Sequence, residues 1–208
     1  METLKPITGT GKTARRSMLA ACTAAAVFLG GCLASAPKAP VNWTIALDRA
    51  DAHATQTASI PPLRLASVSV RAPYDGTRLC VLRPDGSLAF DSFNAFAAAP
   101  SQLMRGALLD ALEAKGVKAY THNSSVHCSY SIEAQATLVA LDCRRQGEAN
   151  ARVDIALTLL DGRRAVSSAK ASGVAPKTGG DFSAIFSRAF ASAAYAAIEN
   201  LFAPEDET

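Results

Sequence analysis

The sequence predicts a single α+β domain in which a mixed or antiparallel sheet carries two main helices on one face. Two observations predict it. Segments with large apolar residues at every second position, typical of strands, are mostly joined by short turn sequences, whereas apolar residues recur at helical spacing in only two segments. Each of these two segments follows a group of strands, an order that favours helices segregated on one side of a sheet. We expect about seven strands.

The first half of the expected domain contains four strands and one helix. We expect a short strand at Trp43–Leu47 and, after a linker from His53 to Pro62, a second strand at Leu63–Val70. The segment Arg78–Asp91 predicts a hairpin, because two apolar stretches flank the turn sequence Pro-Asp-Gly. A helix is expected from Pro100 to Gly116, since proline is tolerated in a first helical turn and glycine commonly follows a last one.

The second half repeats the order of strands followed by a helix. Apolar and polar residues alternate from Tyr130 to Ala140, which predicts a strand with one face in water. Arg152–Leu160 and Ala165–Val174 are expected to form a hairpin around Asp161-Gly162. Asp181 predicts the N-cap of a last helix, whose alanine-rich apolar face predicts close packing on the sheet. The buried face of the first of these strands would consist of Ile132, Ala134, Ala136, Leu138 and Ala140.

The chain begins with the order of features found in a secretory signal peptide. A basic stretch that ends at Arg16 is followed by an uninterrupted apolar or small run from Met18 to Gly31. This run is shorter than the ~20 residues that a membrane-spanning helix needs. We therefore assign residues 1–31 to a signal peptide, 32–41 to a short tether, 42–203 to the folded domain and 204–208 to an acidic tail.

The end of the leader, Leu29-Gly30-Gly31-Cys32, resembles the lipobox of bacterial lipoproteins. This implies cleavage before Cys32 and acylation of its thiol and of the new α-amine. Several acyl chains make a durable anchor, whereas one chain, at about 0.8 kcal/mol per buried methylene, binds only marginally. The alternative is an ordinary signal peptide that ends beside a cysteine. Because Leu33 is not the aspartate that retains lipoproteins at the inner membrane of enteric bacteria, the resemblance implies the periplasmic face of the outer membrane.

The charge of the chain argues against a nucleic-acid-binding protein. The net charge of +3 comes from the leader, since the remaining residues carry equal numbers of acidic and basic side chains. A neutral domain lacks the electrostatic attraction that nucleic-acid binding requires. The pairs Arg144-Arg145 and Arg163-Arg164 are isolated, and such pairs are more typical of solvated turns than of phosphate sites.

Three cysteines follow the lipidated one. Cys128 and Cys143 lie near opposite ends of one expected strand, too far apart for a disulfide. A bridge therefore has to include Cys80, and we favour the pair Cys80 and Cys143. Three free thiols are the alternative.

The sequence shows no pattern of catalytic or metal-binding residues. His122, His127 and Cys128 lie close together, but their spacing matches no common zinc pattern. Asp142 and Asp161 follow expected strands, where solvated turn carboxylates are usual, and no nucleophile elbow, phosphate loop or dinucleotide fingerprint occurs in the expected domain. We therefore expect a protein that is not an enzyme, binds no metal and has no cofactor besides its covalent lipid.

The segment around Tyr74–Pro100 carries a family resemblance. Its order is Pro-Tyr-Asp, the hairpin RLCVLRPDGSLAFD, then Phe-Asn-Ala-Phe, then a proline that opens a helix. This resembles the ABC-type transport auxiliary lipoproteins, the PqiC-like family, and the likeness extends across the expected domain and includes the lipobox. Departures are Phe96, where a larger aromatic residue is expected, and the cysteines that follow the lipobox.

The resemblance implies a non-catalytic accessory of an intermembrane lipid transporter. Its implied partners are a protein with a mammalian-cell-entry (MCE) domain and an inner-membrane ABC permease, and a homo-oligomer is also compatible with the sequence. We expect Tyr74, Phe93 and Phe96 at a partner surface, because aromatic residues often anchor interfaces. Phe90 is a further candidate, for which core packing is an equal alternative. Two other functions stay open: a lipoprotein of envelope assembly without an ABC partner, and a periplasmic enzyme with a dispersed site.

Overall fold

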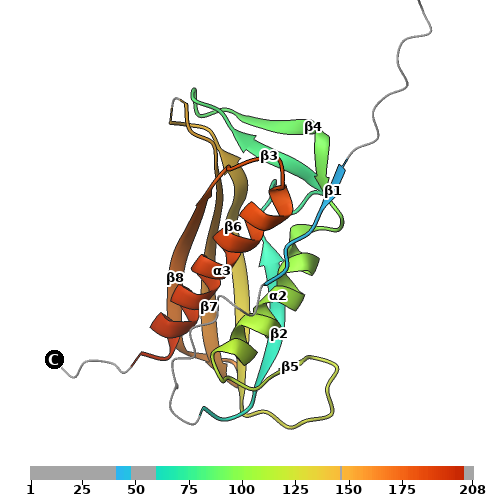
Figure 1. Cartoon of the computed structure of the whole chain (residues 1–208). Helices are drawn as coiled ribbons and strands as arrows, with labels where there is room; N and C mark the ends of the chain where they lie inside the picture. The colour runs from blue at the N-terminus through green and yellow to red at the C-terminus, as the bar shows by residue number, and fades with distance from the viewer. Residues whose placement is uncertain (1–40, 48–59, 146, 204–208) are drawn as a thin grey trace, which may run out of the picture. The chain divides into compact units, whose positions relative to one another are not determined.

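The computed structural model describes residues 41–47, 60–145 and 147–203, all of which belong to one compact unit, Pro40–Thr208 (Figure 1). Within these residues, two helices and one mixed sheet of eight strands confirm the predicted α+β class. The elements are β1 (Val41–Trp43), β2 (Leu63–Val70), β3 (Arg78–Leu82), β4 (Leu88–Phe96), α2 (Pro100–Ala114), β5 (Ala119–Thr121), β6 (Tyr130–Asp142), β7 (Asn150–Asp161), β8 (Arg164–Pro176) and α3 (Phe182–Leu201).

The expected signal peptide, nearly all of the tether, most of the linker after Leu47 and the acidic tail lie outside the described residues. Neither α2 nor α3 combines the length and the apolar character that a membrane-crossing helix requires.

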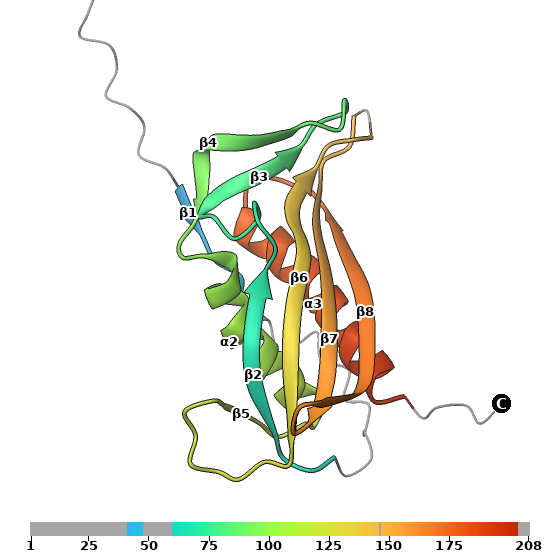
Figure 2. The ribbon, with the colours of Figure 1, turned by 180° about the vertical axis from the view of Figure 1, so that it is seen from behind.

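The sheet is organised around β6 (Figure 2). On one edge, β7 pairs with β6 in antiparallel orientation along its length, and β8 pairs with β7. The other edge of β6 is shared by two strands. Its first part, Tyr130–Ala136, pairs in parallel with β2, and its last two residues pair in parallel with β3. The strand β5 extends the sheet beyond β2, whereas β4 and then β1 extend it beyond β3.

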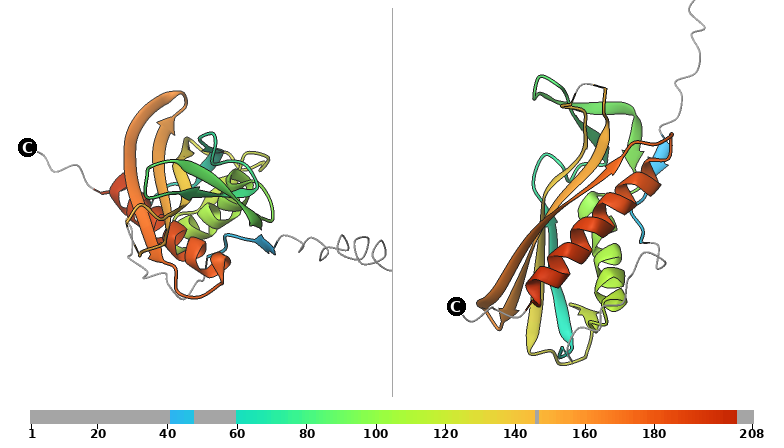
Figure 3. Two further views of the ribbon diagram at one scale, coloured as in Figure 1. Left: turned by 90° about the horizontal axis from the view of Figure 1, so that it is seen from above. Right: turned by 60° about the vertical axis from the view of Figure 1, so that its left-hand side comes forward.

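Both helices cover the same face of the sheet, as predicted (Figure 3, right). The helix α3 crosses β7 and β8, and α2 lies beside it over β2 and β5. The alanine-rich face of α3 approaches β8 so closely that a Cβ atom at Gly173 would overlap the Ala189 carbonyl oxygen and lie 2.7 Å from the Ala193 amide nitrogen. We call the helix-covered side of the sheet the inner face and the opposite side the outer face.

The helix termini follow the predicted signals and add one longer-range contact. The Asp181 carboxylate accepts a hydrogen bond of 3.2 Å from the Ala184 amide and so caps α3. Gly116 follows α2 with a φ of +76°, a conformation that favours glycine. At the start of α2, the amide and the hydroxyl of Ser101 donate to the Asp75 carboxylate at 2.9 and 3.0 Å. Asp75 therefore links the β2–β3 connection to the helix.

The predicted buried face of β6 is wrong at its C-terminal end. Residues up to Ala136 face the main core as expected, but the pairing of β6 with β7 is irregular between Ala136 and Leu138. An extra residue in a strand reverses which side chains face which side of the sheet. Leu138 and Ala140 consequently join Cys80 and Leu82 in a second, smaller hydrophobic cluster on the outer face.

The predicted strand at Trp43–Leu47 is also placed differently, since β1 ends at Trp43. The residues that follow lie along α3, where the amides of Thr44 and Ala46 donate hydrogen bonds of 3.0 Å to the hydroxyls of Ser183 and Ser187. Two serines four positions apart lie on one side of a helix, so they bind alternate amides of an extended segment. This segment therefore ties the beginning of the domain to its last helix.

Candidate functional site

The structure exposes two of the four aromatic candidates for a partner surface. Phe93 is 63% exposed and Phe90 is 40% exposed. Phe96 is 3% exposed, and its ring packs edge-on against Phe186 at a centroid distance of 5.2 Å. The assignment of Phe96 to a partner surface is therefore corrected, because its side chain is part of the main core. Tyr74 is half-buried and packs against both hydrophobic clusters.

Phe93 lies in the irregular part of the β3–β4 pairing, where β4 bends before it pairs with β1 (Figure 2), and Asp91 holds this bend. One carboxylate oxygen of Asp91 accepts from the Phe93 amide at 2.7 Å and from the Asn94 amide at 2.9 Å, and the other accepts from the Asn94 side chain at 3.1 Å. Partial burial of Asp91 opposes ionisation, but these hydrogen bonds outweigh it and lower the pKa of the carboxyl. The backbone that carries the exposed Phe93 ring is therefore held in place by hydrogen bonds to the Asp91 side chain.

A second exposed aromatic ring, that of Phe90, lies three positions before Phe93 on β4. The Arg78 guanidinium lies 4.6 Å from the centroid of the Phe90 ring, a cation–π arrangement. Val41 is 48% exposed and pairs with Asn94 in the parallel β1–β4 ladder. We call the exposed residues Phe90 and Phe93 the β4 surface. It lies beside β1, the first strand that follows the predicted tether.

The structure does not bring Cys80 and Cys143 together. Cys80 is 1% exposed and belongs to the outer cluster, whereas Cys143 packs against the main core, so their side chains point to opposite faces of the sheet. Cys80, Cys128 and Cys143 are all free thiols in the structure. The Cys80–Cys143 bridge is thus not formed, and burial raises the pKa of both thiols.

The two histidines and Cys128 lie in the connection between β5 and β6. Within the ranges that the structure covers, no three His, Cys, Asp or Glu side chains are grouped so as to hold a metal ion. Cys128 is half-buried, and its thiol lies 3.8 Å from the Val126 carbonyl oxygen.

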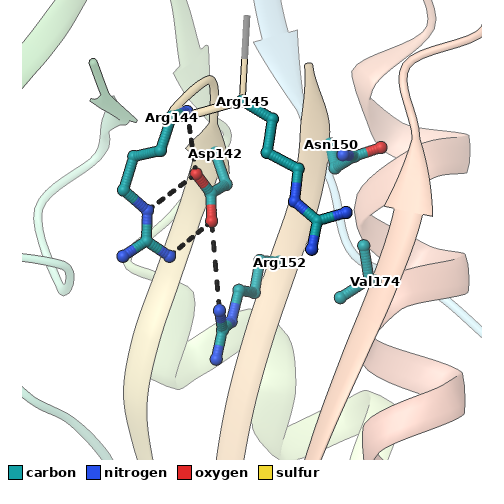
Figure 4. A pocket seen from close by; sticks show the side chains of 6 residues that line it. All are labelled: Asp142, Arg144, Arg145, Asn150, Arg152 and Val174. Carbon is teal, nitrogen blue, oxygen red and sulfur yellow. Dashed lines mark hydrogen bonds and ion pairs between the residues drawn. The ribbon is translucent and has the colours of Figure 1, made fainter. Parts of the chain in front are cut away.

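A cavity of about 430 Å³ lies on the outer face at the end of β6 (Figure 4). The sequence predicts only a solvated turn at this place. Arg144 forms a bidentate pair with Asp142, with distances of 2.9 and 2.6 Å. These hydrogen bonds are the main reason why the pKa of Asp142 is lowered. The residues that line the cavity are Asp142, Arg144, Arg145, Asn150, Arg152 and Val174.

Two features of the sequence contribute to this cavity: the pair Arg144-Arg145 and the arginine two positions after Asn150. Alternate residues of β7 face the same side, so Asn150 and Arg152 share the outer face, and Arg152 pairs with Val174 of β8. The sequence does not reveal that the side chains of Arg144 and Arg145 reach the side of the sheet on which Asn150 and Arg152 lie.

Comparison with models of protein families and with curated protein sequences gives no match. Among solved structures, the chain is similar to protein XCC0632 from Xanthomonas campestris, of family DUF330, with a TM-score of 0.56, 18% identity, and coverage of 77% of this chain and 89% of that one. A second structure, of an uncharacterized protein, has a TM-score of 0.55 and 11% identity, and the match covers 74% of this chain and 93% of that chain.

A third structure, PelC from Paraburkholderia phytofirmans, has a TM-score of 0.44 at 14% identity, and the match covers 72% of this chain and 95% of that chain. The first two likenesses show that this chain shares the fold of a DUF330 protein.

Proposed function

We propose that the chain is a periplasmic lipoprotein anchored to the outer membrane through lipid on Cys32, and that it serves as a non-catalytic accessory of an ABC/MCE-type phospholipid transport system. The lipobox and the resemblance around Tyr74–Pro100 suggest this class of protein. The shared fold with a DUF330 protein is compatible with it. The observation that carries the proposal is the exposed Phe93, which a network of hydrogen bonds to Asp91 holds at the bend of β4.

An exposed aromatic side chain on a well-bonded strand suits a binding protein. Phenylalanine buries a large apolar area on contact, and a ring whose backbone is already ordered loses little conformational entropy when a partner covers it. The exposed ring of Phe90 on the same strand enlarges the apolar area of β4 that a partner can cover. We assign the MCE-domain protein to this surface.

The predicted anchor limits where such a partner is held. Eight residues lie between Cys32 and Val41, so the two positions are nine residue steps apart. A chain of that length spans at most about 30 Å, since an extended residue contributes ~3.3–3.6 Å. A partner bound to the β4 surface, next to β1, is therefore kept close to the periplasmic side of the outer membrane. This is the role of an accessory that secures the outer-membrane end of a transporter.

Copurification of the full chain with the MCE-domain protein of the same bacterium tests the partner assignment. We expect the wild type to retain that protein and Phe93→Ala to retain at least about tenfold less, as for an aromatic interface anchor. The matched control is Val166→Ala on β8, which removes another exposed apolar side chain and should bind as the wild type does. If the wild type does not retain the MCE-domain protein, and lipid trafficking is unchanged in a deletion strain, the proposal is wrong.

Fractionation of a Cys32→Ala variant tests the anchor. Without the thiol, no lipid can be attached, and we expect the chain to leave the membrane fraction. A variant that still sediments with the outer membrane would contradict the anchor, whatever the result of the copurification.

A further inference from the structure

Besides Arg144, which is paired with Asp142, two further arginine side chains line the cavity on the outer face, and they come from different parts of the chain (Figure 4). Arg152 comes from β7, and Arg145 comes from the connection between β6 and β7. Figure 4 shows the Arg145 side chain extending over the start of β7 toward Asn150 and Val174, with its guanidinium on the same side of the sheet as that of Arg152. Two like-charged groups thus face a common space.

The carboxylates around the cavity do not neutralise all of its positive charge. Asp142 is bonded to Arg144 through both of its oxygens. The Arg152 Nε donates to Asp154 at 3.0 Å, and its Nη1 lies 4.0 Å from Asp142. Arg145 forms no ion pair with any residue that the structure describes. Three guanidinium groups therefore face two carboxylates, and the excess charge is that of Arg145.

The remaining groups of the cavity favour a phosphate. A guanidinium offers a planar fork of N–H donors that matches phosphate oxygens, and an anion between two guanidinium groups relieves their mutual repulsion. The Asn150 amide adds a neutral donor, and Val174, 54% exposed, forms an apolar wall. The volume of about 430 Å³ accommodates a phosphate together with the groups that it carries.

We propose that this cavity is a binding site for a phosphate-bearing anion, held between Arg145 and Arg152 with Asn150 as a further donor. The site does not depend on the proposed transport role. A lipid headgroup and a soluble phosphate share this chemistry, and the experiment below distinguishes them.

The second arginine pair of the sequence provides a matched control. Arg163 and Arg164 lie at the β7–β8 turn, at the other end of β7, and both are exposed. Arg163→Gln therefore removes the same charge from a turn of the same sheet without touching the cavity. Replacement of Arg145 breaks no ion pair within the described structure, so Arg145→Gln should fold as the wild type does.

The test is a titration of the mature full chain with inorganic phosphate at low ionic strength. Binding is measured by the NMR chemical-shift changes of the Asn150 and Arg152 amides. We expect saturable shifts in the wild type, an affinity at least about tenfold lower in Arg145→Gln, and a change of less than about twofold in Arg163→Gln. Absence of saturable binding, or equal losses in both variants, would overturn the proposal.

A second titration with dihexanoyl-phosphatidylglycerol distinguishes the two sources of phosphate. Arg145-dependent binding that is about tenfold tighter than that of inorganic phosphate identifies a lipid headgroup site, and equal or weaker binding identifies a site for phosphate itself. Both outcomes support the site. The proposed site is contradicted if Arg145→Gln binds this lipid as tightly as the wild type does and inorganic phosphate does not bind. These results are independent of whether an MCE-domain protein binds the β4 surface.

Discussion

The inner and outer faces of the sheet differ in what their side chains contact, although they alternate along the same strands. On β7, Val153, Ile155 and Leu157 are almost fully buried beneath α3. Arg152 and Asp154, which alternate with them along the strand, lie on the outer face and bond to one another. The inner face is apolar and so closely packed that it excludes a methyl group at Gly173. The difference teaches that neighbouring positions have separate roles: the inner face supplies stability, and the outer side carries the groups available for binding.

The largest effect is expected for Phe186→Ala on the inner side. Phe186 is fully buried on α3 and contacts Phe96, so its removal leaves a cavity between the helix and the sheet. We expect the free energy of unfolding to fall by about 3–5 kcal/mol. Urea denaturation monitored by circular dichroism measures it. A loss below about 1 kcal/mol would mean that the inner face is less tightly packed than the structure shows.

A smaller loss is expected for Gly173→Ala. Replacing glycine by alanine in a strand usually stabilises a protein, because it restricts the unfolded chain. Here the added methyl group would meet the backbone of α3 at Ala189, so we expect destabilisation of about 1–3 kcal/mol. The adjacent Ser172→Ala, on the outer face, should change stability by less than about 0.5 kcal/mol. Thermal unfolding of the two variants compares the faces directly, and equal shifts would contradict their separation.

Asp142→Asn should give a still smaller and pH-dependent loss. The hydrogen bonds from Arg144 lower the pKa of Asp142 against the opposing effect of burial, so the ionised carboxylate stabilises the folded state. This contribution is present above the ordinary carboxyl pKa of ~3.9 and is lost as the pH falls through the lowered value of the folded protein. We expect the wild type to exceed Asp142→Asn by up to about 1 kcal/mol at neutral pH.

Unfolding measured over a pH series checks this, because the stabilities of the two proteins should converge in acid. A difference that is constant with pH would show that the carboxylate charge is not what stabilises the turn.

The smallest effect on stability is expected for Phe93→Ala. Its ring is largely exposed, and the Asp91 hydrogen bonds involve the backbone amide, which alanine retains. We expect a change within about 0.5 kcal/mol in urea denaturation. A loss comparable to that of Phe186→Ala would show that Phe93 is a packing residue and would remove the basis of the binding surface.

Local signals in the sequence predicted most of the elements but neither β5 nor every face of the strands. The hairpin at Asp161-Gly162, the cap at Asp181 and the proline at the start of α2 depend on neighbouring residues, and all are confirmed. The three-residue strand β5 was not predicted, since it is too short for a periodic pattern and pairs with the distant β2. The bulge after Ala136 leaves no signature in the alternation of small apolar residues.

The candidate sites, too, were predicted only in part, because the sequence does not show which side of the sheet a side chain faces. Phe90, Phe93 and Phe96 have the same chemistry, and only the bend at Asp91 and the pairing of Phe96 with Trp43 decide which ring is buried. Cys80 lies on β3, and Cys143 directly follows the neighbouring strand β6. Which side of the sheet each thiol faces depends on the register and on the bulge in β6, and neither can be read from the spacing of the cysteines.

The central place of β6 has a consequence for the order in which the domain folds. Its pairing with β7, and that of β7 with β8, closes short loops, whereas its parallel pairing with β2 joins Leu63 to Tyr130 across the whole of α2. Closing longer loops costs more entropy, so contacts between sequence neighbours form earlier. We expect the β6–β8 meander and α3 to assemble first and β1 to β4 to dock afterwards. The β4 surface would then be completed late, and a partner that recognises it would engage only chains that have finished folding.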